Sequence, residues 1–203
     1  MNPAIIVLNY KRYDLAAQTM SANLPIAGIN YGLIVVDQFG LAKALNIGLK
    51  KAIDAGYDCF LFMGNDILEP PGFLLRRMLF LQEHPKAGIV SLGFEEGPAH
   101  QTTVIGNYMI TKELVEVIGG FDESFDPYGA IDLDYCNRAN KAGFESWYVG
   151  GPCAKHIDNH GELETSNVYG FNKKEMINKT WIKYVESTMR PDYTIFKDQF
   201  FTP

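Results

Sequence analysis

The segment Cys59-Phe60-Leu61-Phe62-Met63-Gly64-Asn65-Asp66 decides the fold of this chain. Its five consecutive apolar residues, Cys59 to Met63, are typical of a short strand that is buried on both faces. The run ends at Gly64-Asn65-Asp66, and Pro70-Pro71-Gly72 then forces a turn. Open α/β sheets bind ligands at the carboxyl ends of their strands, which is where this segment places Asp66. Asp66 is therefore a candidate binding residue, and a turn or helix-capping role suits an aspartate there equally well.

Buried strands and amphipathic helices alternate through the first third of the chain. The apolar runs 4–8 and 33–36 predict two more strands, which end at Asn9-Tyr10 and at Asp37. Helical spacing follows in residues 14–22 and 41–55. This order predicts an α/β fold with a mostly parallel central sheet and helices on both faces.

Later patterns predict the remaining elements. We expect strands at 87–92, 103–110 and 145–149, a polar loop at 95–102, and helices at 74–82, 111–118, 132–142 and 173–189. The last helix carries Ile177, Trp181, Tyr184 and Val185 on one stripe, and an aromatic tail with Phe196, Phe200 and Phe201 follows it. We therefore expect residues 166–203 to pack on the preceding domain, residues 1–165, or on a partner chain, with a homo-oligomer as one form of the second case.

Composition and charge exclude several classes of protein. The chain has 203 residues, is 47% hydrophobic and has a net charge of −6, which suits one compact domain without a broad nucleic-acid-binding surface. The three cysteines have no metal-type spacing, and no run is long enough for a transmembrane segment or a signal peptide, so we expect a cytoplasmic protein without disulfides. No glycine-rich phosphate loop is present, which argues against dinucleotide-dependent dehydrogenases and P-loop enzymes.

Three carboxylates and one imidazole could support chemistry: Asp37, Asp66, Asp132 and His156. A carboxylate that faces a phosphate directly is repelled by about 4 kcal/mol per pair of unit charges near a protein surface. A divalent cation between the two removes this repulsion, and an oxygen-rich site of this kind suits Mg²⁺ or Mn²⁺. From the residues alone, a hydrogen-bonded loop histidine is the favoured interpretation of His156, ahead of a metal ligand. Asp132 and Asp134 could either stabilise a helix N-terminus or supply a general base.

Several segments together resemble family 2 glycosyltransferases with the GT-A fold. The first half contributes the strand that ends at Asp37, the helix motif 40–48 (GLAKALNIG), and Gly64-Asn65-Asp66 in place of the metal-binding DxD. The second half contributes the GGFDE segment 119–123, the segment 131–144 (IDLDYCNRANKAGF), and His156. The resemblance covers about residues 4 to 160 and implies a nucleotide-binding half, 1–66, followed by an acceptor half, 67–165.

The resemblance implies an inverting transferase that uses a nucleotide-diphosphate sugar, with a UDP-sugar favoured, and Mn²⁺ or Mg²⁺. Asp66 would hold the metal with His156 as a second ligand, and Asp132 would deprotonate an acceptor that the sequence does not identify. The donor would be bound by Asn9, Tyr10, Asp37, Lys43, Asn65 and Asp66. The acceptor would be contacted by Asn107, Tyr108, Tyr128 and Asp134.

The chain departs from the family pattern at three places. Gly64 stands where the first Asp of the DxD motif is expected. Ile131 stands where the family has a Glu directly before the Asp that matches Asp132, and the loop after Asp37 is very short. These departures leave open a nucleotide-sugar-binding relative without turnover. A nucleotidyltransferase is a third alternative, although such enzymes normally carry a glycine-rich basic loop where Asn9-Tyr10-Lys11-Arg12 stands.

Overall fold

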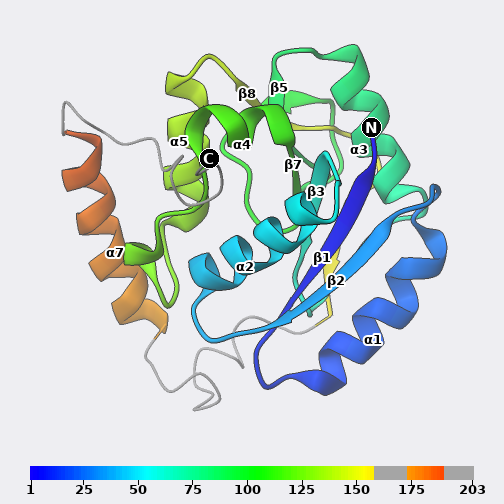
Figure 1. Ribbon diagram of the computed structural model, residues 1–203, viewed down its shortest axis with the longest axis horizontal. Helices are drawn as coiled ribbons and strands as arrows, with labels where there is room; N and C mark the ends of the chain where they lie inside the picture. The colour runs from blue at the N-terminus through cyan, green and yellow to red at the C-terminus, as the bar shows by residue number, and fades with distance from the viewer. Residues whose placement is uncertain (158–172, 190–203) are drawn as a thin grey trace.

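A computed structural model describes residues 1–157 and 173–189 of the chain (Figure 1). Its centre is a seven-stranded sheet with the order β2-β1-β3-β7-β5-β8-β6. The strands are β1 (Pro3–Asn9), β2 (Gly32–Asp37), β3 (Cys59–Met63), β5 (Ala87–Ser91), β6 (His100–Gln101), β7 (Tyr108–Thr111) and β8 (Glu145–Tyr148). β1, β2, β3, β5 and β8 run in one direction, and β7 and β6 run against them. The expected mostly parallel sheet is thus confirmed.

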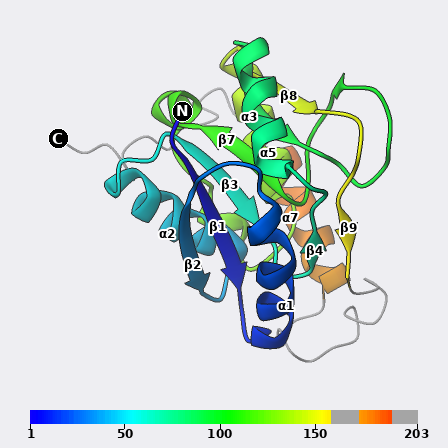
Figure 2. The same ribbon diagram turned by 90° about the vertical axis from the view of Figure 1, so that its right-hand side faces the viewer.

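Helices cover both faces of this sheet, as predicted (Figures 1 and 2). One face packs against α2 (Leu41–Asp54), α4 (Lys112–Ile118) and α5 (Ile131–Lys141). The other packs against α3 (Phe73–Glu83), α1 (Tyr13–Asn23) and the short 3₁₀ turn η1 (Leu24–Ile26). β3 shows why its sequence is apolar throughout: Phe60 and Phe62 enter the first core, and Leu61 and Met63 enter the second. Burial of both sets stabilises a central strand.

The approach of α2 to the sheet depends on a small residue. An added Cβ at Gly48 would lie 2.3 Å from Ile6 Cγ2, which is too close for any side chain. Asn46, on the same helix, accepts a hydrogen bond from the Phe121 amide at 2.8 Å and donates one to its carbonyl oxygen at 2.9 Å. The helix motif 40–48 is therefore joined directly to the GGFDE segment, so two distant parts of the sequence meet.

Three features differ from the sequence-based expectations. The strand expected at 103–110 is confined to β7, because Gly106 adopts a positive φ of 78° and the Asn107 carbonyl accepts from Ser91 Oγ at 2.7 Å instead of pairing in the sheet. A small second sheet, β4 (Ile67–Leu68) paired antiparallel with β9 (Lys155–His156), was not predicted. The polar loop at 95–102 contains the two residues of β6.

The C-terminal helix α7 (Lys173–Thr188) packs on the domain through only part of the predicted stripe, which includes Tyr184. Ile177 and Trp181 are 41% and 51% exposed, whereas Thr180 is buried and Tyr184 packs against the core. The Ala130 amide donates to Thr180 Oγ1 at 3.3 Å, and Lys183 Nζ donates to the Ser124 carbonyl oxygen at 2.7 Å. These two contacts to the loop before α5 are polar, and apolar periodicity could not predict them. The aromatic tail lies outside the described residues.

Two further findings concern the bulk expectations. Cys59, Cys136 and Cys153 are all free thiols, as expected of a chain without disulfides. Within residues 1–157 and 173–189, no helix combines the length and the apolar character needed to cross a bilayer.

Candidate functional site

A cavity of about 270 Å³ lies at the carboxyl ends of β1 and β3. Tyr108 joins its wall because β7 runs antiparallel to β3 and so begins at this same edge of the sheet. Nine of the residues predicted for the site line it. They are Asn9, Tyr10, Asn65, Asp66, Asn107, Tyr108, Tyr128, Asp132 and His156. The structure therefore brings together most of a site whose members are spread over about 150 positions of sequence.

Asp66 and His156 lie together in one corner of the cavity. The β4–β9 pairing places Ile67 opposite His156, and the Ile157 amide donates to the Asp66 carbonyl oxygen at 2.7 Å. As a result Asp66 Oδ2 and His156 Nδ1 lie 3.6 Å apart, with side chains 20% and 24% exposed. Phe94 stacks on the His156 ring with centroids 4.5 Å apart, which fixes the plane of the imidazole.

This pair suits a cation that is shared with a ligand. One carboxylate oxygen and one imidazole nitrogen are donors that Mn²⁺ accepts in proteins. Across the described part of the chain, no group of three or more His, Cys, Asp or Glu side chains could enclose a metal on its own. The remaining coordination positions would therefore fall to water and to an oxygen-rich ligand such as a diphosphate.

Asp132, in the first turn of α5, also lines the cavity. Tyr108 donates its hydroxyl hydrogen to Asp132 Oδ1 at 3.0 Å. Burial raises the pKa of the Asp132 carboxyl to about 7, while the hydrogen bonds from Tyr108 and from the Gly106 backbone oppose the rise. A carboxyl with this pKa exchanges a proton readily near neutral pH, which is what a general base requires.

The end of the cavity next to β2 is aromatic and amide-rich. The Asn65 side-chain amide donates to Asn9 Oδ1 at 2.9 Å and so joins the ends of β1 and β3. The rings of Tyr10 and Phe39 lie 5.2 Å apart at a tilted angle, and both line the cavity. Flat aromatic surfaces beside amide groups can bind a nucleobase by stacking and hydrogen bonding.

The loop before α5 is fixed by the N-terminus of α2. Asp126 Oδ1 accepts from the Ala42 amide at 2.7 Å, Asp126 Oδ2 accepts from the Lys43 amide at 3.2 Å, and the Leu41 amide donates to the Pro127 carbonyl oxygen at 3.1 Å. Asp126 thus caps a helix more than 80 residues away and holds the next residues of the loop against the cavity. Gly40 is required here, because an added Cβ would lie 2.6 Å from Asp126 Oδ2.

In sequence, the chain is similar to galactosyltransferases. Beta-1,4-galactosyltransferase 2 of Mus musculus is 28% identical over 124 residues, which cover 58% of this chain and 33% of that protein. The Homo sapiens protein of the same name matches to the same extent. The match thus spans about a third of the length of these curated relatives. No protein-family model matches the chain.

Solved structures of glycosyltransferases share its architecture. The catalytic domain of Drosophila beta1,4galactosyltransferase 7, in complex with xylobiose, superposes with a TM-score of 0.61 at 22% identity and covers 86% of this chain and 78% of that one. A mannosyltransferase from Pyrobaculum calidifontis, in complex with GDP-Man and Mn²⁺, superposes with a TM-score of 0.65 at 15% identity, over 98% of this chain and 68% of that one. The chain has the GT-A fold. The fold expected from its motifs is therefore confirmed.

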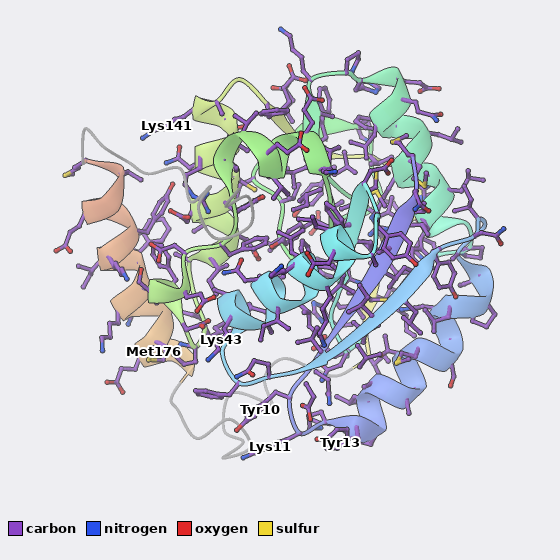
Figure 3. The ribbon with its side chains drawn as sticks, in the orientation of Figure 1. Tyr10, Lys11, Tyr13, Lys43, Lys141 and Met176 are labelled. Atoms are coloured by element: carbon purple, nitrogen blue, oxygen red, sulfur yellow. The ribbon has the colours of Figure 1, made fainter. Side chains whose placement is uncertain are left out.

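Three of the residues predicted for the site do not line the cavity: Asp37, Lys43 and Asp134. Asp37 is exposed and accepts a hydrogen bond from the Tyr13 hydroxyl. Lys43 has an exposed side chain (Figure 3), and its backbone amide donates to Asp126 Oδ2. Both residues lie next to cavity residues without facing the cavity.

Asp134 corrects the acceptor-binding expectation. It is 3% exposed and forms an ion pair with Arg138, with Oδ2 and Nε 2.9 Å apart. The reason is helical phase: two residues along an α-helix turn the side chain by about 200°, so Asp132 and Asp134 point to opposite sides of α5. Asp134 is therefore buried beside Arg138 and does not line the cavity.

Sequence reasoning also missed residues that build the GT-A site. Phe39 follows Asp37 by two positions and carried no motif, and Phe94 lies just before the polar loop 95–102, so no local pattern indicated its stacking on His156. Asp126 caps a helix from a distance, so no local pattern marks it. Glu69 and Arg77 were not singled out, although a Glu and an Arg eight positions apart within apolar surroundings were a signal that a buried pair was present.

Proposed function

We propose that the chain is an inverting glycosyltransferase that moves a sugar from a nucleotide-diphosphate sugar to an acceptor hydroxyl with the assistance of a divalent metal. One observation carries the proposal: Asp132 and the Asp66–His156 pair line the same cavity, at the sheet edge where GT-A proteins and other open α/β folds bind ligands. The acceptor remains unidentified, since the residues around the cavity carry no readable preference for a glycan, a lipid or a protein.

Asp66 and His156 would hold Mn²⁺ or Mg²⁺. The bound ion would supply positive charge that stabilises the diphosphate leaving group. Asp66 Oδ2 and His156 Nδ1, 3.6 Å apart, are only two metal ligands, so the pair should have little affinity for metal unless the diphosphate is present. The metal and the nucleotide sugar should therefore bind cooperatively. Asn9, Tyr10, Asn65 and Phe39 would bind the nucleoside end of the donor.

Asp132 would act as the general base. Tyr108 donates to Oδ1 and the Gly106 backbone also hydrogen-bonds to the carboxylate, so the acceptor hydroxyl would approach Oδ2, the oxygen that Tyr108 does not contact. A proton that moves from that hydroxyl to Oδ2 makes the acceptor oxygen nucleophilic, and attack on the sugar carbon from the side opposite the diphosphate inverts its configuration. A positioned base of this kind typically contributes about 10²–10⁴-fold to the rate.

The solved relatives support a nucleotide-sugar donor. Besides the mannosyltransferase complex with GDP-Man and Mn²⁺, a mutant of Drosophila beta1,4galactosyltransferase 7 is known in complex with manganese, UDP-Gal and xylobiose; it superposes at a TM-score of 0.61 and 21% identity, over 87% of this chain and 79% of that one. The complex with UDP-Gal is that of a galactosyltransferase, and the sequence similarity is also to galactosyltransferases, so a UDP-sugar is favoured over a GDP-sugar.

A nucleotide-sugar-binding protein without turnover is the second candidate, and Gly64 favours it. An added Cβ at Gly64 would lie 3.2 Å from Asp66 Oδ1, so this position adjoins the metal-binding carboxylate without contributing a second one. The intact Asp132–Tyr108 pair supports the enzyme instead, because a binding protein gains nothing from a buried carboxyl at this place.

The direct test is donor turnover. Purified protein is incubated with UDP-, GDP-, CDP- and dTDP-sugars and Mn²⁺, with and without a panel of acceptors, and release of the nucleoside diphosphate is measured. The enzyme requires release from one donor by the native chain and none by Asp132→Asn, with donor binding intact in both. Binding of a donor without release under every condition would favour the binding protein.

A further inference from the structure

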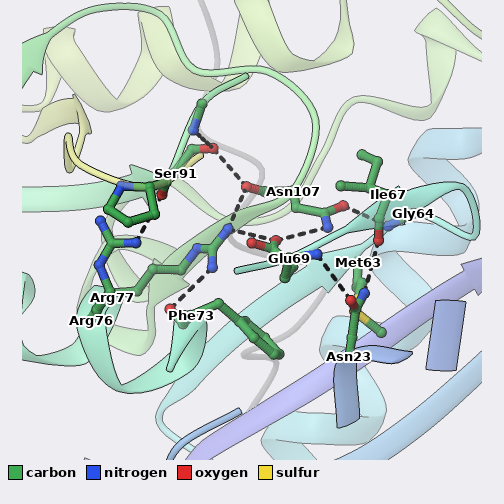
Figure 4. A network of polar contacts seen from close by, with 12 residues as sticks. Asn23, Met63, Gly64, Ile67, Glu69, Phe73, Arg76, Arg77, Ser91 and Asn107 are labelled. Atoms are coloured by element: carbon green, nitrogen blue, oxygen red, sulfur yellow. Dashed lines mark hydrogen bonds and ion pairs between the residues drawn. The ribbon is translucent and has the colours of Figure 1, made fainter. Parts of the chain in front are cut away.

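A buried polar cluster lies beneath the metal-binding loop, residues 64–66 (Figure 4). Its centre is an ion pair between Glu69 Oε1 and Arg77 Nη2 at 2.7 Å, and both side chains are fully buried. Replacing a buried ion pair by well-packed apolar residues is often neutral or stabilising, so stability alone is a weak reason for its presence. A role in orienting neighbouring side chains is a better explanation for the pair.

The pair orients Asn107. The Asn107 side-chain amide donates to Glu69 Oε1 at 2.9 Å, and Asn107 Oδ1 accepts from the Gly64 backbone amide at 2.7 Å. A carboxylate only accepts and a backbone N–H only donates, so the side chain of Asn107 has one permitted orientation. The backbone carbonyl oxygen of Asn107 is fixed as well: it accepts from Ser91 Oγ at 2.7 Å and from Arg77 Nη2 at 3.3 Å.

Asn107 in turn connects the two sides of the cavity. Its acceptor oxygen holds Gly64, two residues before Asp66. Its own backbone leads directly to Tyr108, which donates to Asp132. One buried cluster thus sets both the position of the metal-binding carboxylate and that of the residue bonded to the base.

The loop is held from its other side by α1. Thr19 Oγ1 donates to the Asn65 carbonyl oxygen at 2.7 Å. The Asn23 side chain donates to the Ile67 carbonyl oxygen at 2.8 Å and accepts from the Glu69 amide at 2.9 Å. On the β7 side, the loop 64–66 is held by the hydrogen bond from the Gly64 amide to Asn107 Oδ1. Loss of this hydrogen bond would release the loop on that side.

We propose that the buried Glu69–Arg77 pair is a positioning element that fixes Asn107 and, through Gly64, the distance of Asp66 from His156. Neither side chain lines the cavity, so the pair acts only through Asn107. The metal-dependent part of the proposal rests on the proposed function; the contact with Gly64 does not.

The test replaces both charges together, in the double variant Glu69→Met with Arg77→Met, so that no lone charge stays buried. The first measurement is hydrogen exchange at the Gly64 amide by NMR, in the metal-free protein. Loss of an oriented acceptor should accelerate this exchange about two- to tenfold, the equivalent of one hydrogen bond, while amides in β1 keep their rates. The second is the Mn²⁺ concentration that gives half-saturation of nucleoside diphosphate binding, which should rise about 10- to 100-fold, as for other residues that orient metal ligands.

The chain offers a matched control. Asp134 and Arg138 form a second buried ion pair, with side chains 4% and 3% exposed, on the far side of α5 from the cavity. The variant Asp134→Met with Arg138→Met should leave Gly64 exchange and Mn²⁺ half-saturation at their native values even if it lowers the melting temperature. A shift of the same size in this control would mean that any buried pair produces the effect, and would overturn the proposal.

Asn107→Ala provides a second route, for use if the double variant fails to fold. It removes the acceptor of Gly64 directly and leaves Glu69 paired with Arg77, so it should reproduce both shifts. If either variant folds and its Gly64 amide exchanges hydrogen at the native rate, the inference is refuted. Accelerated exchange in a protein whose native form binds no nucleoside diphosphate with Mn²⁺ would support the Gly64 contact, and would show that the proposed function, and the metal-dependent part of the inference with it, has failed.

Discussion

Replacing Asp132 by Asn should make the protein more stable while it abolishes transfer. Burial raises the pKa of this carboxyl from 3.8 to about 7, so the folded state resists its ionisation. A difference of about 3 pKa units corresponds to about 4 kcal/mol, at about 1.36 kcal/mol per unit. Asn keeps an acceptor oxygen for Tyr108 and carries no charge, so it avoids this cost.

The sign and the pH window follow from the raised pKa. The native carboxyl costs nothing below its unfolded pKa, and its cost grows as pH rises towards the folded value. The stability gap between the variant and the native protein should therefore widen by about 2 kcal/mol between about pH 5.5 and about pH 8. Tyr128 and Cys136, which lie near Asp132, have pKa values raised to about 12 by burial, so they do not titrate in this window.

The assay is urea denaturation of both proteins at the two pH values, followed by tryptophan fluorescence. Groups that are the same in both proteins contribute equally and cancel in the difference. A gap that stays constant with pH, or a variant that is less stable at the higher pH, would refute the assignment of a desolvated, proton-exchanging carboxyl to Asp132.

Three further predictions concern neighbouring residues. Asp66→Asn should abolish the Mn²⁺-dependent part of nucleotide binding in a thermal-shift assay, since one neutral amide oxygen replaces the carboxylate beside His156; retained metal dependence would place the cation elsewhere. Tyr108→Phe removes a hydrogen bond that favours the ionised form of Asp132, so the pKa of Asp132 should rise and the acid limb of the pH–rate profile should move to higher pH; an unshifted limb would show that another group controls it. Asp126→Ala removes the cap of α2 and should lower the free energy of unfolding by about 0.5–2 kcal/mol in urea titrations, whereas no change would mean that water replaces the cap without cost.

The sequence allowed much of the fold to be predicted because the apolar pattern is strong where the sheet is buried. β1, β3, α2, α3 and α5 lie within one or two residues of their predicted ranges, and each has either a continuous apolar run or a clear helical period. β4 and β9 escaped prediction because two-residue strands have no period to detect. The packing face of α7 was predicted only in part: Tyr184 packs against the core as expected, but Ile177 and Trp181 are exposed, and Thr180 accepts a hydrogen bond from the Ala130 amide instead.

The site could be predicted as a set of residues, but its internal connections could not. Asp66, Asp132 and His156 fall on motifs that have fixed order along the chain. The contacts that set their geometry join β3 to β7 and α2 to a loop beyond residue 120, and such contacts depend on tertiary structure. Asp134 was included because it belongs to a motif. Its position on α5 points its side chain away from the cavity, where it forms a buried ion pair with Arg138.

The central claim is that Asp66, His156 and the end of β1 form a metal-dependent site for a nucleotide-diphosphate sugar. Calorimetric titration with UDP, GDP and their sugars, with and without Mn²⁺, tests it most directly. We expect one nucleotide to bind with Mn²⁺, to bind much more weakly without it, and to lose this metal dependence in Asp66→Asn. Binding of no nucleotide under any condition, or binding that is indifferent to Mn²⁺ and to Asp66, would contradict the claim.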